Sequence, residues 1–223
     1  TGGSIAYSSW RNNFTVRGNN RPDLAYSNFD QRHRVIAAGT YRLNWTKNIG
    51  TTFSAFYQGY NQGRATLRIV GDVNGDQLAG NDLMWVPTSA DDLTWSDIKN
   101  SAGDVLFTIA EQKAAFNEYL TKSGYATSRV GNYTERNGVI LPWLNQIDLG
   151  IQQDFAIKAG KTTQRFQLRL DLYNAGNLLN SAWGVADRLV LGTPLTYNVK
   201  NQTYNYAMTN NQRRTDSFDR DAS

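Results

Sequence analysis

Two stretches of alternating apolar and polar residues, at 144–157 and 163–175, constrain the fold of this chain more than any other feature. In the first stretch the apolar positions are Ile147, Leu149, Ile151 and Phe155, interrupted only by Gln153. In the second they are Phe166, Leu168, Leu170 and Leu172. Successive side chains of a strand point to opposite faces, so each stretch predicts a strand with one oily and one polar face. A short turn at 158–161 joins the two into a long antiparallel hairpin.

A second hairpin of the same design is predicted at 33–46 and 51–61, joined by a turn at 47–50. Each arm has roughly the 9 to 11 residues that a tilted strand needs to cross a bilayer, whereas strands of soluble sheets stop at about 5 to 6. The alternation alone leaves two architectures open. One is the wall of a membrane barrel, and the other is a soluble sandwich whose oily face meets a second sheet.

The long polar segment at 62–142 between the hairpins favours the barrel. A loop of that length counts against strand assignments in a compact soluble domain, but barrels combine short periplasmic turns with long extracellular loops. A mean hydropathy of -0.55 is compatible with a barrel, because only alternate strand residues need be apolar. The net charge of +4 comes from scattered basic residues, which argues against a nucleic-acid footprint. Zero cysteines exclude disulfides and thiol chemistry.

Local signals predict further elements within the loops. Thr108 and Glu111 form a capping box ahead of a helix at 109–122, whose Phe116 and Leu120 are expected to pack against the loop body. Residues 1–30 are predicted to be loop with short strand pieces, and residues 193–208 are predicted to form a hairpin.

A stretch rich in Asp and Asn at 71–82 is the one candidate metal site. Asp72, Asn74, Asp76 and Asp82 resemble the oxygen ligands of a calcium loop. The pattern departs from an EF-hand, because Gln77 replaces the sixth-position glycine and Leu83 stands at the twelfth position. The alternative is a turn in which these side chains accept hydrogen bonds from their own backbone.

Catalytic constellations are absent from the sequence, so the chain is predicted not to be an enzyme. The single histidine, His33, lies between two arginines, and no G-x-S-x-G, H-E-x-x-H or phosphate-loop motif occurs. Four loop tryptophans are candidates for stacking on a ligand, or alternatively for anchoring the loops: Trp10, Trp85, Trp95 and Trp183.

Several short motifs follow one another along most of the chain. They are S-N-F-D-Q-R-H-R at 27–34, D-x-N-G-D at 72–76 followed by N-D-L-M-W-V-P at 81–87, R-N at 136–137 with P-W at 142–143 and I-D-L at 147–149, and N-L-L-N at 177–180 with W-G at 183–184. In this ordered set the chain resembles Oar-like TonB-dependent outer-membrane transporters.

The resemblance implies an all-β fold: a partial transmembrane antiparallel barrel, the C-terminal strands of a 22-stranded barrel, with long extracellular loops of which one carries a short helix. It implies that a plug domain and earlier strands lie upstream, and that a final strand is missing from this chain. The implied location is the outer membrane of a Gram-negative bacterium. The implied partners are outer-membrane lipid, the upstream strands and plug, the TonB complex acting through the plug, and a surface lipoprotein.

The function that the resemblance implies is TonB-dependent active transport of a substrate, with no cofactor apart from the candidate structural calcium. The alternative is a soluble extracellular β-protein that binds glycan through its loop tryptophans. In the transporter, the whole chain is one incomplete domain with membrane strands at about 33–46, 51–61, 144–157 and 163–175 and extracellular loops at about 1–30, 62–142 and 176–218.

The alternation then assigns the two faces of the strands. Lipid-facing positions are Val35, Tyr41, Leu43, Phe53, Tyr57, Ile147, Leu149, Ile151, Phe155, Phe166, Leu168, Leu170 and Leu172. Lumen-facing and plug-facing positions are Arg34, Arg42, Asp148, Arg169 and Asp171. Trp45 is predicted to lie in the periplasmic aromatic belt.

Overall fold

The structure, a computed structural model, describes residues 4–181, 183–208 and 218–220, so parts of the predicted loops 1–30 and 176–218 lie outside the described residues. The described chain is rich in strands that pair mostly antiparallel. It divides into two compact units. The loop unit comprises Thr1–Asp30, Gly63–Leu141 and Arg188–Asp219, and the sheet unit comprises Gln31–Gln62, Pro142–Asp187 and Arg220–Ser223.

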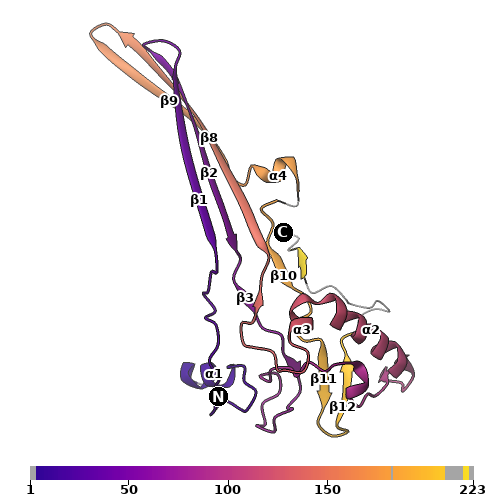
Figure 1. Cartoon of the computed structure of the whole chain (residues 1–223). Helices are drawn as coiled ribbons and strands as arrows, with labels where there is room; N and C mark the ends of the chain where they lie inside the picture. Colours follow the sequence, from indigo (N-terminus) through magenta and orange to yellow (C-terminus); the bar gives the residue numbers. More distant parts are fainter. Residues whose placement is uncertain (1–3, 182, 209–217, 221–223) are drawn as a thin grey trace. The chain divides into compact units, whose positions relative to one another are not determined.

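Four long strands form the body of the sheet unit (Figure 1). They are β1 (Arg34–Asn44), β2 (Ile49–Asn61), β8 (Trp143–Ala159) and β9 (Thr162–Leu172). Their order is β1-β2-β8-β9, and every neighbouring pair is antiparallel. The two predicted hairpins are therefore joined into one sheet through β2 and β8. Among the described residues the sheet is open, because β1 and β9 each keep one edge without a partner strand.

The strand lengths follow from the nearly continuous two-residue period of the sequence, which Gln153 interrupts in β8. The four strands have 11, 13, 17 and 11 residues, well above the roughly 5 to 6 that are usual in soluble sheets. Both tight turns lie at the same end of the sheet, where Ala156 N–H donates to the Asn48 carbonyl at 2.7 Å. A short helix, α4 (Gly176–Leu179), follows β9.

The remaining elements are short. They are α1 (Ile5–Arg11), β3 (Arg64–Ala65), β4 (Ile69–Val70), the 3₁₀ helix η1 (Ala90–Asp92), β5 (Ile98–Lys99), β6 (Val105–Phe107), α2 (Ile109–Lys122), α3 (Gly124–Ser128), β7 (Val139–Ile140), β10 (Asp187–Leu189), β11 (Leu195–Asn198), β12 (Thr203–Tyr206) and β13 (Phe218–Arg220). They pair as β12-β11-β4, β3-β7, β5-β6 and β10-β13. The antiparallel pair β11–β12 is the hairpin predicted at 193–208.

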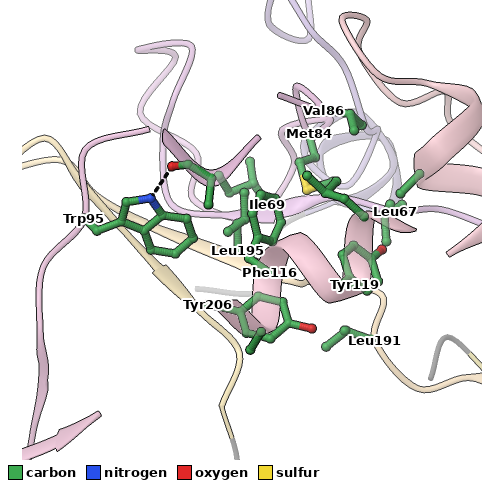
Figure 2. Close-up of a cluster of buried hydrophobic side chains, with 14 of the residues drawn as sticks. Leu67, Ile69, Met84, Val86, Trp95, Phe116, Tyr119, Leu191, Leu195 and Tyr206 are labelled. Carbon is green, nitrogen blue, oxygen red and sulfur yellow. Dashed lines mark hydrogen bonds between the residues drawn. The ribbon is translucent and has the colours of Figure 1, made fainter. Parts of the chain in front are cut away.

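The loop unit has a hydrophobic core of its own, built around α2 (Figure 2). The predicted capping box is formed in both directions, because Thr108 Oγ1 accepts from Glu111 N–H and the Glu111 carboxylate accepts from Thr108 N–H. Phe116 is fully buried, and its ring centre lies 5.7 Å from that of Tyr206. The predicted packing of Phe116 and Leu120 is confirmed.

The core keeps its tyrosines neutral. Burial raises the pKa of Tyr119 to about 12, although a hydrogen bond with Ser123 opposes the shift, and burial also raises the pKa of Tyr206. A neutral phenol is compatible with an apolar core, whereas a phenolate would require desolvation of a charge. These residues therefore have a packing role.

One prediction for the N-terminal segment is wrong, because residues 5–11 form a helix instead of strand pieces. Ser4 caps α1 by accepting the Tyr7 N–H at 3.2 Å. The helix has only seven residues and none of them is buried, so it is too short to show the apolar periodicity by which a helix is recognised.

Candidate functional site

The four-stranded sheet has two chemically different faces, and the register shows how they are assembled. Tyr41 pairs with Phe53, Phe53 with Ile151, and Ile151 with Leu170. Paired residues of an antiparallel sheet project from the same face, so the register brings all thirteen residues that were predicted to face lipid onto one face. None of the thirteen is buried, and Leu168 is 72% exposed. We call this surface the apolar face.

Each end of the apolar face carries an aromatic ring with a bonded polar atom. At the turn end, Trp45 Nε1 donates to Thr51 Oγ1 at 2.6 Å, and Thr51 Oγ1 donates to Gln153 Oε1 at 2.6 Å. Gln153, which interrupts the apolar pattern, is therefore the final acceptor in this series of two hydrogen bonds. At the other end, Asn145 Oδ1 accepts hydrogen bonds from Tyr57 Oη and Trp143 Nε1. A glycine is needed at position 59 beside this cluster, because a Cβ there would lie 2.7 Å from the Trp143 ring.

Sequence reasoning missed the second aromatic cluster. Both of its β8 residues lie at the start of that strand: Trp143 precedes the predicted strand 144–157, and Asn145 comes before the first apolar position named in it, Ile147. The signal was present as a tryptophan two residues before an asparagine, but only the register shows that Tyr57 of β2 reaches the same amide.

The opposite face of the sheet carries all five residues that were predicted to face the lumen, and we call it the polar face. Arg42 pairs with Asp154 at 2.8 Å, and Arg169 pairs with Asp171 at 2.9 Å. Asp148 accepts the Asn174 N–H at 2.7 Å. Partly exposed ion pairs of this kind contribute only about 0 to 1 kcal/mol. The two ion pairs therefore add little to the stability of the sheet.

Within the loop unit, a buried arginine joins segments that the resemblance had singled out separately. Arg64 is bonded to Asp30 and donates to the Asn137 carbonyl at 3.2 Å, while its guanidinium lies 3.6 Å from the centre of the Tyr26 ring. Asn137 Nδ2 also donates to Asn28 Oδ1 at 2.6 Å. We call these five residues the Arg64 clamp. No sequence signal pointed to Arg64, because its partners lie 34 and 73 residues away.

The segment at 72–82 is held by hydrogen bonds from its own backbone. The Asp72 carboxylate accepts the N–H groups of Gly75, Asp76 and Gln77 at 2.7 to 3.0 Å. Asp82 accepts the N–H groups of Val73 and Asn74. These are the turn contacts that were the alternative to a calcium site. In the part of the chain that the structure describes, no group of three or more His, Asp or Glu side chains is placed to hold a metal ion. Calcium binding by Asp72, Asn74, Asp76 and Asp82 stays a prediction.

Asp82 is expected to titrate above the ordinary aspartate value of 3.8. Burial raises its pKa, the backbone N–H groups of Val73 and Asn74 oppose the shift, and the nearby Asp76 and Asp72 carboxylates add to it. Since the folded-state pKa is the higher one, this group stabilises the fold fully below pH 3.8, and the contribution is lost as the pH rises through the raised pKa. Carbon NMR titration of the Asp82 carboxyl measures this pKa, and a pKa at or below 3.8 would contradict the prediction.

The same titration tests calcium binding. A bound cation favours the ionised carboxylate, so excess Ca²⁺ is expected to lower the pKa of Asp82 if the segment at 72–82 holds the ion. An unchanged titration in excess Ca²⁺ would leave the backbone hydrogen bonds as the whole role of these side chains. The Asp76→Asn variant serves as a control, because it removes one candidate ligand charge and should weaken the response to Ca²⁺.

The four candidate tryptophans do not share one site. Trp10, Trp85 and Trp183 are 43%, 44% and 48% exposed. Trp95 is only 7% exposed, lies in the core and donates from Nε1 to the Ala90 carbonyl at 2.6 Å (Figure 2). The inclusion of Trp95 among the ligand-stacking candidates is therefore corrected, because a buried ring has no face to offer.

The remaining candidates add no further site. His33 precedes β1, and its carbonyl accepts the Asn61 N–H at 3.2 Å. No helix in the described part of the chain combines the length and apolar content needed to span a membrane.

Comparisons with protein-family models, with curated proteins and with solved structures find no match for this chain.

Proposed function

We propose that this chain forms part of the barrel wall and extracellular loops of an Oar-like TonB-dependent outer-membrane transporter. The observation that carries the proposal is the apolar face, whose thirteen side chains are not covered by a second layer among the described residues. At roughly 25 cal/mol per Å² of apolar surface, leaving such a face in water forfeits a large stabilisation. Lipid is the environment that this face matches.

The dimensions of the apolar face fit a bilayer. Gln153 and Asn145, which mark the two aromatic ends of the apolar face on β8, lie eight positions apart. At about 3.3 Å per residue and a tilt of about 40°, this distance spans roughly 20 Å across the membrane, comparable to the apolar band of about 25 Å in outer-membrane barrels. The two tight turns then lie at the periplasmic end, and the loop unit belongs to the extracellular loops.

The two open edges of the sheet require partner strands. An unpaired backbone group in hydrocarbon costs several kcal/mol, and bacterial barrels begin at about eight strands. In this proposal the edges of β1 and β9 are paired by further strands of a 22-stranded barrel, and the polar face meets a plug domain inside it. A TonB complex pulls on that plug, and the energy comes from the proton gradient of the inner membrane.

Extraction of the full-length protein from cells tests the proposal. A barrel is expected to stay with the outer-membrane fraction through high-salt and alkaline washes and to require detergent for release. A peripheral or secreted protein is released by the washes, because only electrostatic contacts hold it. Release into the wash would overturn the transporter function.

Loosening of the plug is the expected result of Arg169→Leu. Removing the guanidinium leaves Asp171 without its partner at 2.9 Å and deprives the plug of a hydrogen-bond donor on the polar face. Permeability to a large antibiotic is expected to rise several-fold in cells that express the variant. Arg169→Lys, which keeps the charge, is the control, and equal permeability of wild type and Arg169→Leu would count against a plug on this face.

The alternative function is glycan binding by a soluble extracellular protein. The exposure of Trp10, Trp85 and Trp183 favours it. It predicts release in the same washes and retention on immobilised polysaccharide that is lost when these tryptophans are replaced by alanine. The proposed surface lipoprotein partner is tested separately, by its co-purification with the detergent extract.

A further inference from the structure

A hollow of about 410 Å³ in the loop unit is lined almost entirely by apolar and aromatic side chains. Its lining residues are Ile69, Val73, Leu83, Trp85, Leu93, Tyr133 and Tyr204. None of them is charged and none carries an amide. We call it the Trp85 hollow. Most small-molecule sites are concave and apolar, with a few polar groups that orient the ligand.

The wall of the Trp85 hollow is held in place by the core and by backbone hydrogen bonds. Met84 and Val86, on either side of Trp85, are fully buried, so the alternation of the extended chain turns the Trp85 ring outward. Tyr133 lies opposite Trp85 in an isolated β-bridge, with the two ring centres 5.0 Å apart and edge to face. The backbone of Tyr204 donates to the Thr94 carbonyl at 2.8 Å.

Three polar atoms of the lining residues have no protein partner among the described residues. They are Trp85 Nε1, Tyr133 Oη and Tyr204 Oη, which form none of the side-chain hydrogen bonds of the described residues and are not among the buried atoms without a partner, so they are open to solvent or a ligand. Trp85 and Tyr133 are also 44% and 41% exposed, although tryptophan and tyrosine normally bury most of their rings. The hollow thus offers aromatic surfaces and hydrogen-bonding groups that no atom of the described residues uses. A ligand with an aromatic ring and a polar substituent could use both.

A second apolar hollow, of about 260 Å³, differs in this respect. There the Tyr125 hydroxyl accepts the Glu135 N–H at 2.9 Å, and the Tyr119 hydroxyl is hydrogen-bonded with Ser123. Its polar atoms are used within the fold. The second hollow is therefore explained by packing, whereas the Trp85 hollow is not.

We propose that the Trp85 hollow binds an uncharged aromatic ring with one polar substituent, of the indole or phenol class. The absence of charged lining residues excludes an ion as the preferred ligand, because a desolvated charge would lack a partner. A sugar ring requires several directed polar partners, usually carboxylates or amides, and the lining supplies neither. Stacking against Trp85 and Tyr133 and one hydrogen bond to a free hydroxyl satisfy an indole or a phenol.

Binding to the full-length detergent-solubilised protein tests this proposal with indole, 4-methylphenol and methyl glucoside as probes, measured by saturation-transfer NMR and calorimetry. Ligands of this size are expected to bind with Kd on the order of 0.1 to 1 mM. Trp85→Ala is expected to weaken indole binding roughly tenfold, since an aromatic contact is lost. Val73→Phe is expected to abolish binding, because Val73 is 41% exposed at the hollow and the larger ring fills it without disturbing the core.

Trp183→Ala is the matched control, because Trp183 is 48% exposed but does not line the hollow. Indole and 4-methylphenol binding that survives Trp183→Ala and is lost in Val73→Phe supports the proposal. The absence of saturable binding by both aromatic probes, binding of methyl glucoside in their place, or indole binding unchanged in both Trp85→Ala and Val73→Phe would overturn it. The assay measures binding directly, so the proposal stands or falls independently of transport.

Discussion

Leu149→Arg is expected, in the proposed barrel wall, to destabilise the folded protein by about 2 to 4 kcal/mol, the cost of an arginine at mid-membrane on a lipid-facing strand position. Leu149 lies on the apolar face, four residues from Gln153 and four from Asn145, and is therefore midway between its two aromatic ends. Its neighbours in the register are Ala55 and Leu172, neither of which offers a partner for the guanidinium. Denaturant unfolding in bilayers and the amount of folded protein in the outer membrane measure the effect.

Ile36→Arg is the matched control, because Ile36 is also an exposed aliphatic residue of the sheet, at 54% exposure, but lies on the polar face. Its partner in β2 is Gln58. The control variant is expected to stay within about 0.5 kcal/mol of wild type, as for most surface substitutions. If both faces meet water, both variants should be near neutral. Equal effects of the two substitutions would therefore remove the argument for a lipid-facing wall.

Arg64→Ala is expected to lower the free energy of unfolding of the loop unit by about 2 to 3 kcal/mol, the second-largest effect that we expect. The Arg64 side chain is 7% exposed, and its loss leaves Asp30 and the Asn137 carbonyl without their donor and Tyr26 without its cation. Breaking a fully buried pair costs about 3 to 5 kcal/mol, and we reduce this because the Asp30 side chain is 33% exposed. Denaturant unfolding and proteolysis at 26–30 measure the change.

The matched control is Arg17→Ala, which removes an ion pair whose side chains are 65% and 44% exposed. Such a pair contributes about 0 to 1 kcal/mol, so the control separates burial from charge. Arg64→Lys should fall between wild type and Arg64→Ala, because lysine keeps the charge but loses the planar contact with Tyr26. Equal stability of Arg64→Ala and Arg17→Ala would show that the Arg64 clamp contributes no more than a surface pair.

Elements whose stability is local could be predicted from the sequence. The capping box of Thr108 and Glu111 involves residues three apart, and α2 begins and ends where it was predicted. The long strands of the sheet follow a two-residue period that few other structures share. The chemistry of their two faces was predicted for the same reason, since strand geometry alone alternates the side chains.

Elements that depend on distant partners could not be predicted in this way. The Arg64 clamp joins residues 34 and 73 positions apart, and the Trp85 hollow draws its lining from five separate stretches between Ile69 and Tyr204. Trp95 was indistinguishable from the exposed tryptophans until the fold placed it in the core. Residues 5–11 were predicted as loop because a helix of seven residues is too short to show a clear apolar period in the sequence.

The sequence by itself determined that this protein has long two-faced strands and a capped helix, because period and capping act between residues a few positions apart. Only the tertiary structure decided that β2 pairs with β8, that thirteen large side chains gather on one face of the sheet without being buried, and that Trp85 and Tyr133 border a hollow. The physical reason is that pairing and packing energies depend on contacts between residues far apart in the chain, which no local pattern encodes.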